Sequence, residues 1–349
     1  MPSFSKAHVL ATLVLSLLVT KAGAQDLSTP VAYLSHFNEK LRAVNQTYIN
    51  YLSAVSHGKS ARKVEKLREK TVNMIFNTRM DVSGTPPFKG DKALRDATVA
   101  YLKTCYIVFN EDYSKIVNME EIAEQSYDAM EAYLLAQQKA GEKLEEAAKL
   151  RHEQMKMFAE SHNITLVDKK DDLDLKMEQS DKVTAYYNKV FLIFFKSNKQ
   201  DAYLTQAINV LDINGVEQNK NALQNYANAG LEDIAAIGAF ESDARLTTAC
   251  KKALQFYKEL TAERMTIVSN YILAGDAFNK LKKEFDAKPA AKRTQADVDA
   301  YNKAVAEMNK WGTAFNKSND TLNNERTAVI NAWNKSVTSF MDIHMPYAR

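Results

Sequence analysis

The chain has 349 residues, 46% of them hydrophobic, and it holds only 10 glycines and 6 prolines. That length suffices for two compact units, and so few glycines and prolines favour long helices over the many turns of a sheet protein. Because 46 basic and 43 acidic residues nearly cancel, the charge gives no reason to expect nucleic acid or an anionic membrane surface as a partner.

Residues 1–24 have the pattern of a signal peptide. Lys6 supplies the positive start, Val9 to Val19 form a short apolar run, and Ala22–Ala24 are small residues at cleavage distance. The alternative, a membrane anchor, needs about 20 apolar residues. We expect an exported mature chain from Gln25, periplasmic or at the cell surface or secreted, without a transmembrane segment and with 44 basic against 43 acidic groups.

Residues 25–162 are expected to form a first helical bundle. Thr29 is a helix cap with Pro30 at the first helical position, and His57–Gly58 ends this helix. A second helix is predicted from Ser60 to about Met80. Asp81–Pro87 is expected to be a loop, because Gly84, Pro86 and Pro87 oppose helix.

Two more helices complete the predicted first bundle. Asp91 caps the third, and Asn118 with Glu121 indicates either a fresh cap or a kink in a continuing helix. The fourth is expected to reach about His162. Its apolar stripe consists of Tyr127, Met130, Leu134, Leu144, Ala148, Met155 and Phe158.

Residues 163–179 lose the helical period and gather charge, so they are predicted to link two halves. Residues 180–349 are expected to form the second bundle, with Ser180 as the first cap. Phe191–Phe195 is apolar on nearly all sides, which is typical of a central helix. Asp212–Gly215 breaks this helix, and the next is predicted over Val216–Ile237.

One long helix is predicted from Leu246 to Phe285. Apolar residues recur along it at alternating steps of four and three, and only Arg264 interrupts them. This average spacing of 3.5 is that of a helix whose seam lies against a neighbouring helix. Thr294 and Asp297 have the spacing of a capping box for the last helix, which Pro346 ends.

The two halves also resemble one another. A shift of 152 positions aligns their third helices, pairing Phe88 with Phe240, Asp91 with Asp243, Leu94 with Leu246, Ala97 with Ala249, Leu102 with Leu254 and Glu111 with Glu263. Phe158 and His162 resemble Phe340 and His344 at a larger offset. We predict an all-α fold of two tandem, elongated four-helix bundles. The repeat reflects either duplication or chance similarity of heptad-rich helices.

Residue patterns for catalysis, metal binding or cofactors are not found in the sequence. A di-iron bundle needs Glu-x-x-His, and the nearest pattern is the reverse, His36-x-x-Glu39. Exported duplicated bundles of the imelysin type carry Gly-x-His-x-x-Glu, but Leu34 replaces the glycine here. Cys-x-x-Cys-His, Gly-x-Ser-x-Gly and phosphate-binding glycine loops are also missing. We therefore predict no catalytic residue, no metal site and no cofactor.

Arg264 and Arg326 are the candidate ligand-binding residues. Each places a charge on an otherwise apolar seam of the second half. A buried arginine needs a carboxylate partner or an anion, because unpaired burial is expensive. One interpretation is an interhelical ion pair or a seam that opens there. The other is an anionic ligand between the helices of the second bundle.

Cys105 and Cys250 each lie on an apolar helical stripe, where a free cysteine acts as a small hydrophobe. Because an exported protein meets an oxidising compartment, a disulfide between them is the alternative.

One stretch of the second half carries a family resemblance. It consists of Asp201–Leu204, Asp212–Gln218, Ala222–Leu223, Tyr226–Ala227, Asp243, Leu246, Ala249–Cys250, Leu254 and Phe256–Lys258. These residues resemble the LIC-type family of exported bacterial surface proteins of uncertain function, over about Lys182 to Ala262. The resemblance implies an exported all-helical protein and offers no catalytic residues.

Two classes of function follow from these patterns. The leading hypothesis is an exported surface or periplasmic helical-bundle protein that acts by contact with a protein partner of the cell envelope or with a small ligand. The alternative is a small-molecule or metal-binding protein, or a hydrolase, with a site between the bundles. A weaker idea is a structural spacer that holds a partner away from the membrane.

Overall fold

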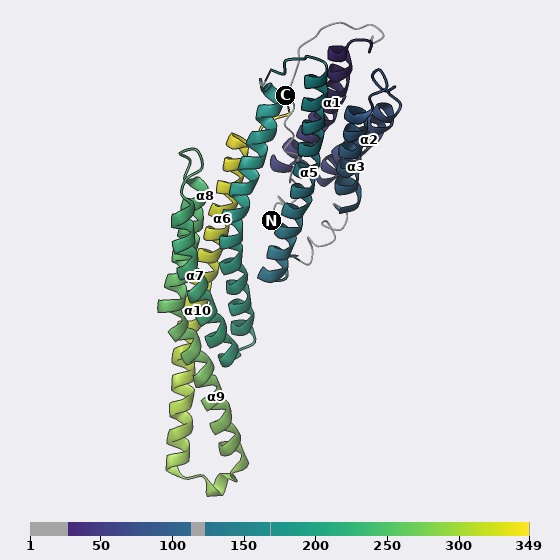
Figure 1. The fold of residues 1–349 in the computed structure, drawn as a ribbon. Helices are drawn as coiled ribbons and strands as arrows, with labels where there is room; N and C mark the ends of the chain where they lie inside the picture. Colours follow the sequence, from purple (N-terminus) through teal and green to yellow (C-terminus); the bar gives the residue numbers. More distant parts are fainter. Residues whose placement is uncertain (1–26, 113–122, 168, 349) are drawn as a thin grey trace. The chain divides into compact units, whose positions relative to one another are not determined.

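A computed structural model describes residues 27–112, 123–167 and 169–348 (Figure 1). In these ranges the chain is helical, and its only β-type pairings are the isolated bridges Phe88–Asp91 and Phe240–Asp243. The all-α fold class is therefore confirmed. Within the same ranges, no helix combines the length and the hydropathy needed to cross a bilayer. The predicted signal peptide, residues 1–24, lies outside the described residues.

The described chain divides into two compact units. Unit 1 holds the residues up to Asn188 and those from Thr338, and unit 2 is Lys189–Val337. Unit 1 contains α1 (Pro30–Ser56), α2 (Ala61–Ser83), α3 (Ala93–Ile107), the π-helical turn η1 (Val108–Asp112) and α5 (Tyr127–Ser161). Unit 2 contains α7 (Ile213–Ile237), α8 (Arg245–Glu259), the π-helical turn η2 (Leu260–Arg264), α9 (Met265–Ala287) and the 3-10 turn η3 (Ala290–Lys292).

Two long helices contribute to both units, α6 (Asp172–Asn209) and α10 (Gln295–His344). The division therefore differs from the predicted domains 25–162 and 180–349, since it falls within helices and not in a loop. Two tandem four-helix bundles stay a prediction.

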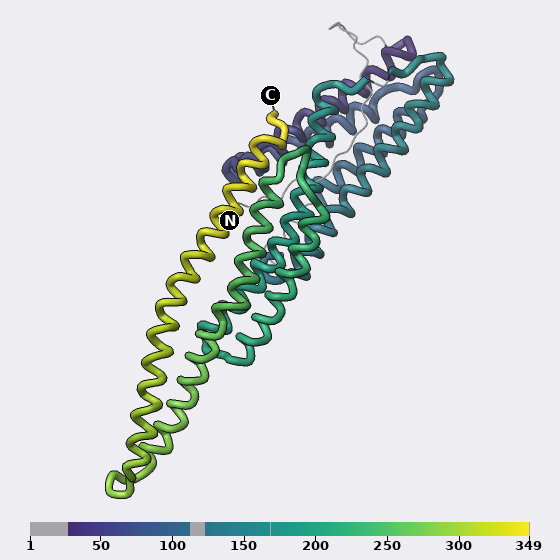
Figure 2. Tube along the Cα trace, turned by 90° about the vertical axis from the view of Figure 1, so that its left-hand side faces the viewer, coloured from purple at the N-terminus to yellow at the C-terminus, as the bar shows by residue number. Residues whose placement is uncertain are grey.

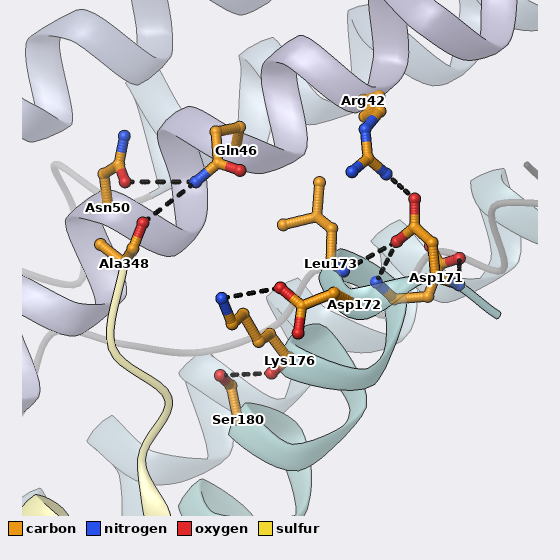
Figure 3. Close-up of polar contacts among 10 residues, drawn as sticks. Arg42, Gln46, Asn50, Asp171, Asp172, Leu173, Lys176, Ser180 and Ala348 are labelled. Carbon is orange, nitrogen blue, oxygen red and sulfur yellow. Dashed lines mark hydrogen bonds and ion pairs between the residues drawn. The ribbon is translucent and has the colours of Figure 1, made fainter. Parts of the chain in front are cut away.

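The start of α6 corrects the predicted linker 163–179. Asp171 caps this helix, because its carboxylate accepts from the backbone N–H groups of Leu173 at 2.7 Å and Asp174 at 3.0 Å. It also pairs with Arg42 of α1 (Figure 3). Ser180 is not a cap but an interior residue, whose hydroxyl donates to the Lys176 carbonyl at 2.8 Å. In the sequence, Asp171 could not be recognised as a cap because it lies within a run of charged residues.

Other helix ends follow their local capping chemistry. Thr29 accepts from the Ala32 N–H at 3.2 Å, as predicted. The second helix ends at Ser83, three residues beyond the predicted Met80. Asp212 accepts from the Asn214 N–H at 3.1 Å, so α7 begins three residues earlier than predicted. The predicted cap or kink at 118–121 lies outside the described residues.

The core of unit 1 is built around α1. Most of this helix from Tyr33 onward is buried, with Tyr33, Phe37 and Tyr48 at most 2% exposed. In α6, Phe194 and Phe195 are buried, but residues 191–193 are only half-buried. The helix predicted to be all-round apolar is thus less enclosed than α1.

The offset of 152 residues recurs in the turns of the two halves. Lys89 and Gly90 have φ of 49° and 91°, and Glu241 and Ser242 have 47° and 74°. Asp91 accepts from the Ala93 N–H at 2.8 Å, and Asp243 from the Arg245 N–H at 2.9 Å. Positive φ angles are uncommon for residues other than glycine. Two consecutive residues with positive φ followed by a capping aspartate are therefore a specific feature that the two halves share.

The same offset relates the helices that follow. Both α3 and α8 have 15 residues, and each continues into a five-residue π-helical turn, η1 or η2. Buried positions 71, 75, 78 and 82 of α2 correspond to 223, 227, 230 and 234 of α7. In the first half Phe158 contacts His162 with ring centroids 4.5 Å apart, and in the second half Phe340 contacts His344 with centroids 4.7 Å apart. These shared features support duplication over chance similarity.

In unit 2 the predicted long helix 246–285 is formed by α8, η2 and α9, which follow without a break. The hairpin of α9 and α10 runs past the α6–α7 turn to a tip at η3 (Figures 1 and 2). We call residues 273–317 the arm, because no residue between Ile272 and Ser318 is buried. Thr294 and Asp297 cap the start of α10 reciprocally, at 2.9 and 3.3 Å, as predicted.

Candidate functional site

The predicted site residue Arg326 lies on α10 and forms a buried ion pair with Asp201 of α6. Its Nε donates to the two carboxylate oxygens at 2.9 and 3.1 Å, and its Nη2 donates at 2.9 Å. The two side chains are 10% and 8% exposed. Such a forked contact uses the geometry in which guanidinium binds carboxylate best. An anionic ligand at Arg326 would therefore have to displace Asp201.

A polar group from α8 continues this network. The Tyr257 hydroxyl donates to the Asn198 side-chain oxygen at 3.0 Å, and burial raises the pKa of Tyr257. Asp201 and Arg326 both act electrostatically on Tyr257. Burial also raises the pKa of Asp201, and Arg326 opposes that rise through its hydrogen bonds and its charge. The network joins α6, α8 and α10 inside unit 2.

Arg264, the second predicted site residue, ends the π-helical turn η2. The Thr261 hydroxyl in this turn donates to the carbonyls of Tyr257 and Lys258 at 3.1 and 2.9 Å. Arg264 is 39% exposed, and its Nη2 lies 3.6 Å from the Glu325 carboxylate. Because Glu325 precedes Arg326, the structure brings both predicted arginines to the same stretch of α10. The ion-pair interpretation fits both, although only Arg326 is buried.

A third arginine, Arg151 of α5, is the residue that sequence reasoning missed. It is 3% exposed, and its Nη1 is buried without a hydrogen-bond partner. The signal was the one used for Arg264 and Arg326. Leu144, Ala148, Met155 and Phe158 step by four and three around position 151. Arg151 therefore interrupts an apolar stripe in the first half as the other two do in the second.

The remaining candidates have ordinary structural surroundings. His36 lies 3.3 Å through Nε2 from the Thr85 hydroxyl, and burial lowers its pKa. Across the described residues, no group of three or more histidine, cysteine or acidic side chains could hold a metal ion. Cys105 and Cys250 are buried free thiols, and burial raises the pKa of each to about 12. Each thiol is therefore protonated at neutral pH.

A polar cluster in unit 1 ties the chain's C-terminal residues to α1. Gln46 donates to the Ala348 carbonyl and to the Asn50 side chain, both at 3.4 Å (Figure 3). His57 stacks on Tyr347 with centroids 3.9 Å apart. These contacts hold the last residues and offer no converging set of reactive groups.

Comparison with protein-family models, with curated proteins and with solved structures finds no match for this chain. The site therefore has to be interpreted from its own geometry. What that geometry offers is charge: three arginines on apolar seams, one paired and buried, one paired and half-exposed, and one buried with an unsatisfied nitrogen.

Proposed function

We propose that this chain is an exported, non-catalytic helical module of the cell envelope or surface that binds a helical protein partner along its arm. The observation that carries the proposal is the half-exposed seam of the arm. Export itself rests on the signal-peptide pattern of residues 1–24. The resemblance to the LIC-type family is an expectation that agrees with this proposal.

The seam of the arm is aromatic but incompletely covered. Phe285 stacks on Tyr301 near the tip of the arm with centroids 4.7 Å apart, and Phe315 at its base stacks on Tyr271, which just precedes the arm, at 4.4 Å. All four rings are only partly buried. Two helices cover one side of a heptad seam, so a third helix from a partner would bury the rest. Bringing apolar area out of water is the main driving force for such association.

The charge of the arm indicates what kind of helix fits. Six lysines and arginines lie between positions 280 and 293, against Glu284 and Asp286. Lys282 pairs with Asp286 and Lys288 with Asp297, which leaves four basic residues outside these two pairs. The rest of the chain is nearly neutral, so this basic tip is a local feature. A partner helix with acidic flanks would be steered to it, mainly through a faster association rate.

The position of the arm in the repeat also favours a dedicated role. Up to η1 and η2 the halves align at an offset of 152, whereas the Phe–His pairs of their last helices differ by 182. The second half therefore contains about 30 residues that the first lacks, and the arm lies in that interval. An addition without buried residues contributes little to the core, so contact with another molecule is the role that fits it.

The test is site-specific photo-crosslinking in the native envelope. A photoreactive residue replaces Leu273 on the arm or, as a matched control, Leu135 on α5, since their exposures are 53% and 51%. We expect one dominant protein adduct from position 273 only. Lys280→Glu with Lys283→Glu should reduce its yield at least several-fold. Lys63→Glu with Lys66→Glu, an exposed pair of equal spacing on α2, should leave it unchanged.

The proposal fails if both positions give the same adducts, or if the arm charges do not alter the yield. Circular dichroism of each variant establishes that its helices are intact. An adduct from position 135 alone would move the contact to unit 1 and would also contradict the arm as the binding surface.

A further inference from the structure

Arg151 presents a buried charge that the described protein does not neutralise. It belongs to α5, is 3% exposed, and leaves Nη1 without a hydrogen-bond partner. In the described ranges 27–112, 123–167 and 169–348, no carboxylate forms an ion pair with it, and the groups that respond to its charge are Tyr101 and Cys105. Both of those residues lie on α3, which packs against α5.

Neither neighbour supplies a negative charge. Burial raises the pKa of Cys105 to about 12, so this thiol stays protonated at physiological pH. A tyrosine phenol is also neutral in that range. Burial lowers the pKa of Arg151, but a guanidinium starts so high that it keeps its proton in proteins. Among the residues that the structure describes, the positive charge of Arg151 therefore faces only these neutral groups.

Unit 2 contains a buried guanidinium, that of Arg326, whose carboxylate partner comes from the same chain. Arg326 is also on the last long helix of its half and also interrupts an apolar stripe. Asp201 meets it with three hydrogen bonds of 2.9–3.1 Å. The sequence separation between Arg326 and Phe340 is about one heptad longer than that between Arg151 and Phe158. The two arginines therefore have similar chemistry but do not occupy equivalent positions of the repeat.

An isolated buried charge costs several kcal/mol in a folded protein, and a matched counter-ion removes most of that penalty. A carboxylate is the anion whose two oxygens fit the guanidinium fork. We propose that unit 1 binds one small carboxylate anion, of the size of formate or acetate, against the guanidinium of Arg151. This site is independent of the arm, and either proposal can fail alone.

The test uses the whole mature chain and equilibrium dialysis against ¹⁴C-labelled formate. The ionic strength is held constant with sodium fluoride, and acetate and chloride are added as competitors. We expect saturable binding of one formate per chain, displaced by acetate. Arg151→Met should weaken it at least tenfold, whereas Arg79→Met, the matched change at a partly buried arginine of α2 in the same unit, should leave it unchanged.

A second variant guards against misfolding. Arg151→Lys keeps the charge and loses the fork, so it should bind formate with intermediate affinity while circular dichroism shows an unchanged helix content. Absence of saturable formate binding to the unmodified chain would overturn the proposal, as would equal binding to Arg151→Met. Displacement by chloride but not by acetate would overturn the assignment to carboxylates.

Discussion

At the scale of single residues, this protein places charged side chains in its helical core, among them Arg151 and the pair of Arg326 with Asp201. The Arg326–Asp201 pair does not by itself make a bundle more stable than apolar residues of the same volume would. Removing one partner is strongly destabilising, because the other partner is then left as a buried charge without a counter-ion. The pair therefore constrains how α6 and α10 meet within unit 2.

Asp201→Ala should lower the free energy of unfolding by about 3–5 kcal/mol, because Arg326 then stays buried and unpaired. Urea unfolding followed by circular dichroism measures this. The double variant with Arg326→Met should recover most of the loss. Asp286→Asn, which breaks the exposed pair with Lys282, is the control and should have no measurable effect. An Asp201→Ala protein as stable as the parent would contradict the role of the pair.

A second residue-scale effect concerns pH. Asp181 on α6 has a pKa raised from 3.8 to about 7, mainly by burial and further by the carboxylates of Glu145 and Glu178. The folded state holds the proton of Asp181 more tightly than the unfolded chain does. As the pH rises, the unfolded chain therefore loses this proton first, and the free energy of unfolding decreases. Stability should therefore fall as the pH rises from about 4 to about 7.

Asp181→Asn should remove this pH dependence and stabilise the chain at pH 8, by up to about 4 kcal/mol if about 1.4 kcal/mol accompanies each pH unit. Urea unfolding at pH 5 and pH 8 gives the comparison. The stabilisation should be clearly smaller at pH 5. Equal effects of the substitution at the two pH values would contradict the raised pKa.

At the scale of elements, helix packing depends on how closely the backbones approach. Gly230 in α7 is such a place, since a Cβ built there would lie 3.0 Å from Ile193 Cγ2 and 3.2 Å from Leu254 Cδ1. Gly275 in α9 is the contrasting case. Its added Cβ would meet Met308 at an ordinary 3.7 Å.

The two glycines should respond oppositely to alanine. Gly230→Ala should destabilise the chain by about 1–2 kcal/mol, because overpacking outweighs the gain in helix propensity. Gly275→Ala should stabilise it by about 0.5–1 kcal/mol, since alanine restricts the unfolded chain and the new methyl group has room. Paired thermal melts test both. A stabilising Gly230→Ala would contradict the close contact among α6, α7 and α8.

At the scale of the whole molecule, stability is unevenly distributed along the chain. α1 is enclosed along most of its length, whereas the arm has no buried residue. Segments with few buried contacts open with free energies well below that of global unfolding. The arm is thus the segment most easily opened in unit 2, as a surface that becomes ordered on binding would be.

Amide hydrogen exchange should therefore be at least tenfold faster at 280–310 than in α8. Mass spectrometry of peptides from the exchanged chain measures the ratio. Addition of the crosslinked partner, once purified, should slow exchange in the arm and not in α2. Protection of the free arm equal to that of α8 would mean that its seam is already buried.

The sequence by itself determined the helices and most of their ends. Heptad spacing, capping pairs such as Thr294 with Asp297, and helix ends such as Gly58 depend on a few neighbouring residues, so they can be recognised in the linear chain. The all-α class and the similarity of the two halves at an offset of 152 residues were recognised from the same local signals. The error at Ser180 had a local cause as well, because Asp171 was hidden in a run of charges.

Only the tertiary structure decided which charges on the apolar seams are paired. Arg151, Arg264 and Arg326 give one pattern in the sequence, but the partners of Arg264 and Arg326, Glu325 and Asp201, lie on other helices. Asp201 meets Arg326 from 125 residues away, and nothing local marks that pairing. The exposure of the arm has the same origin. A seam of 3.5 spacing predicts that a helix has neighbours, while their number depends on how the whole chain is folded.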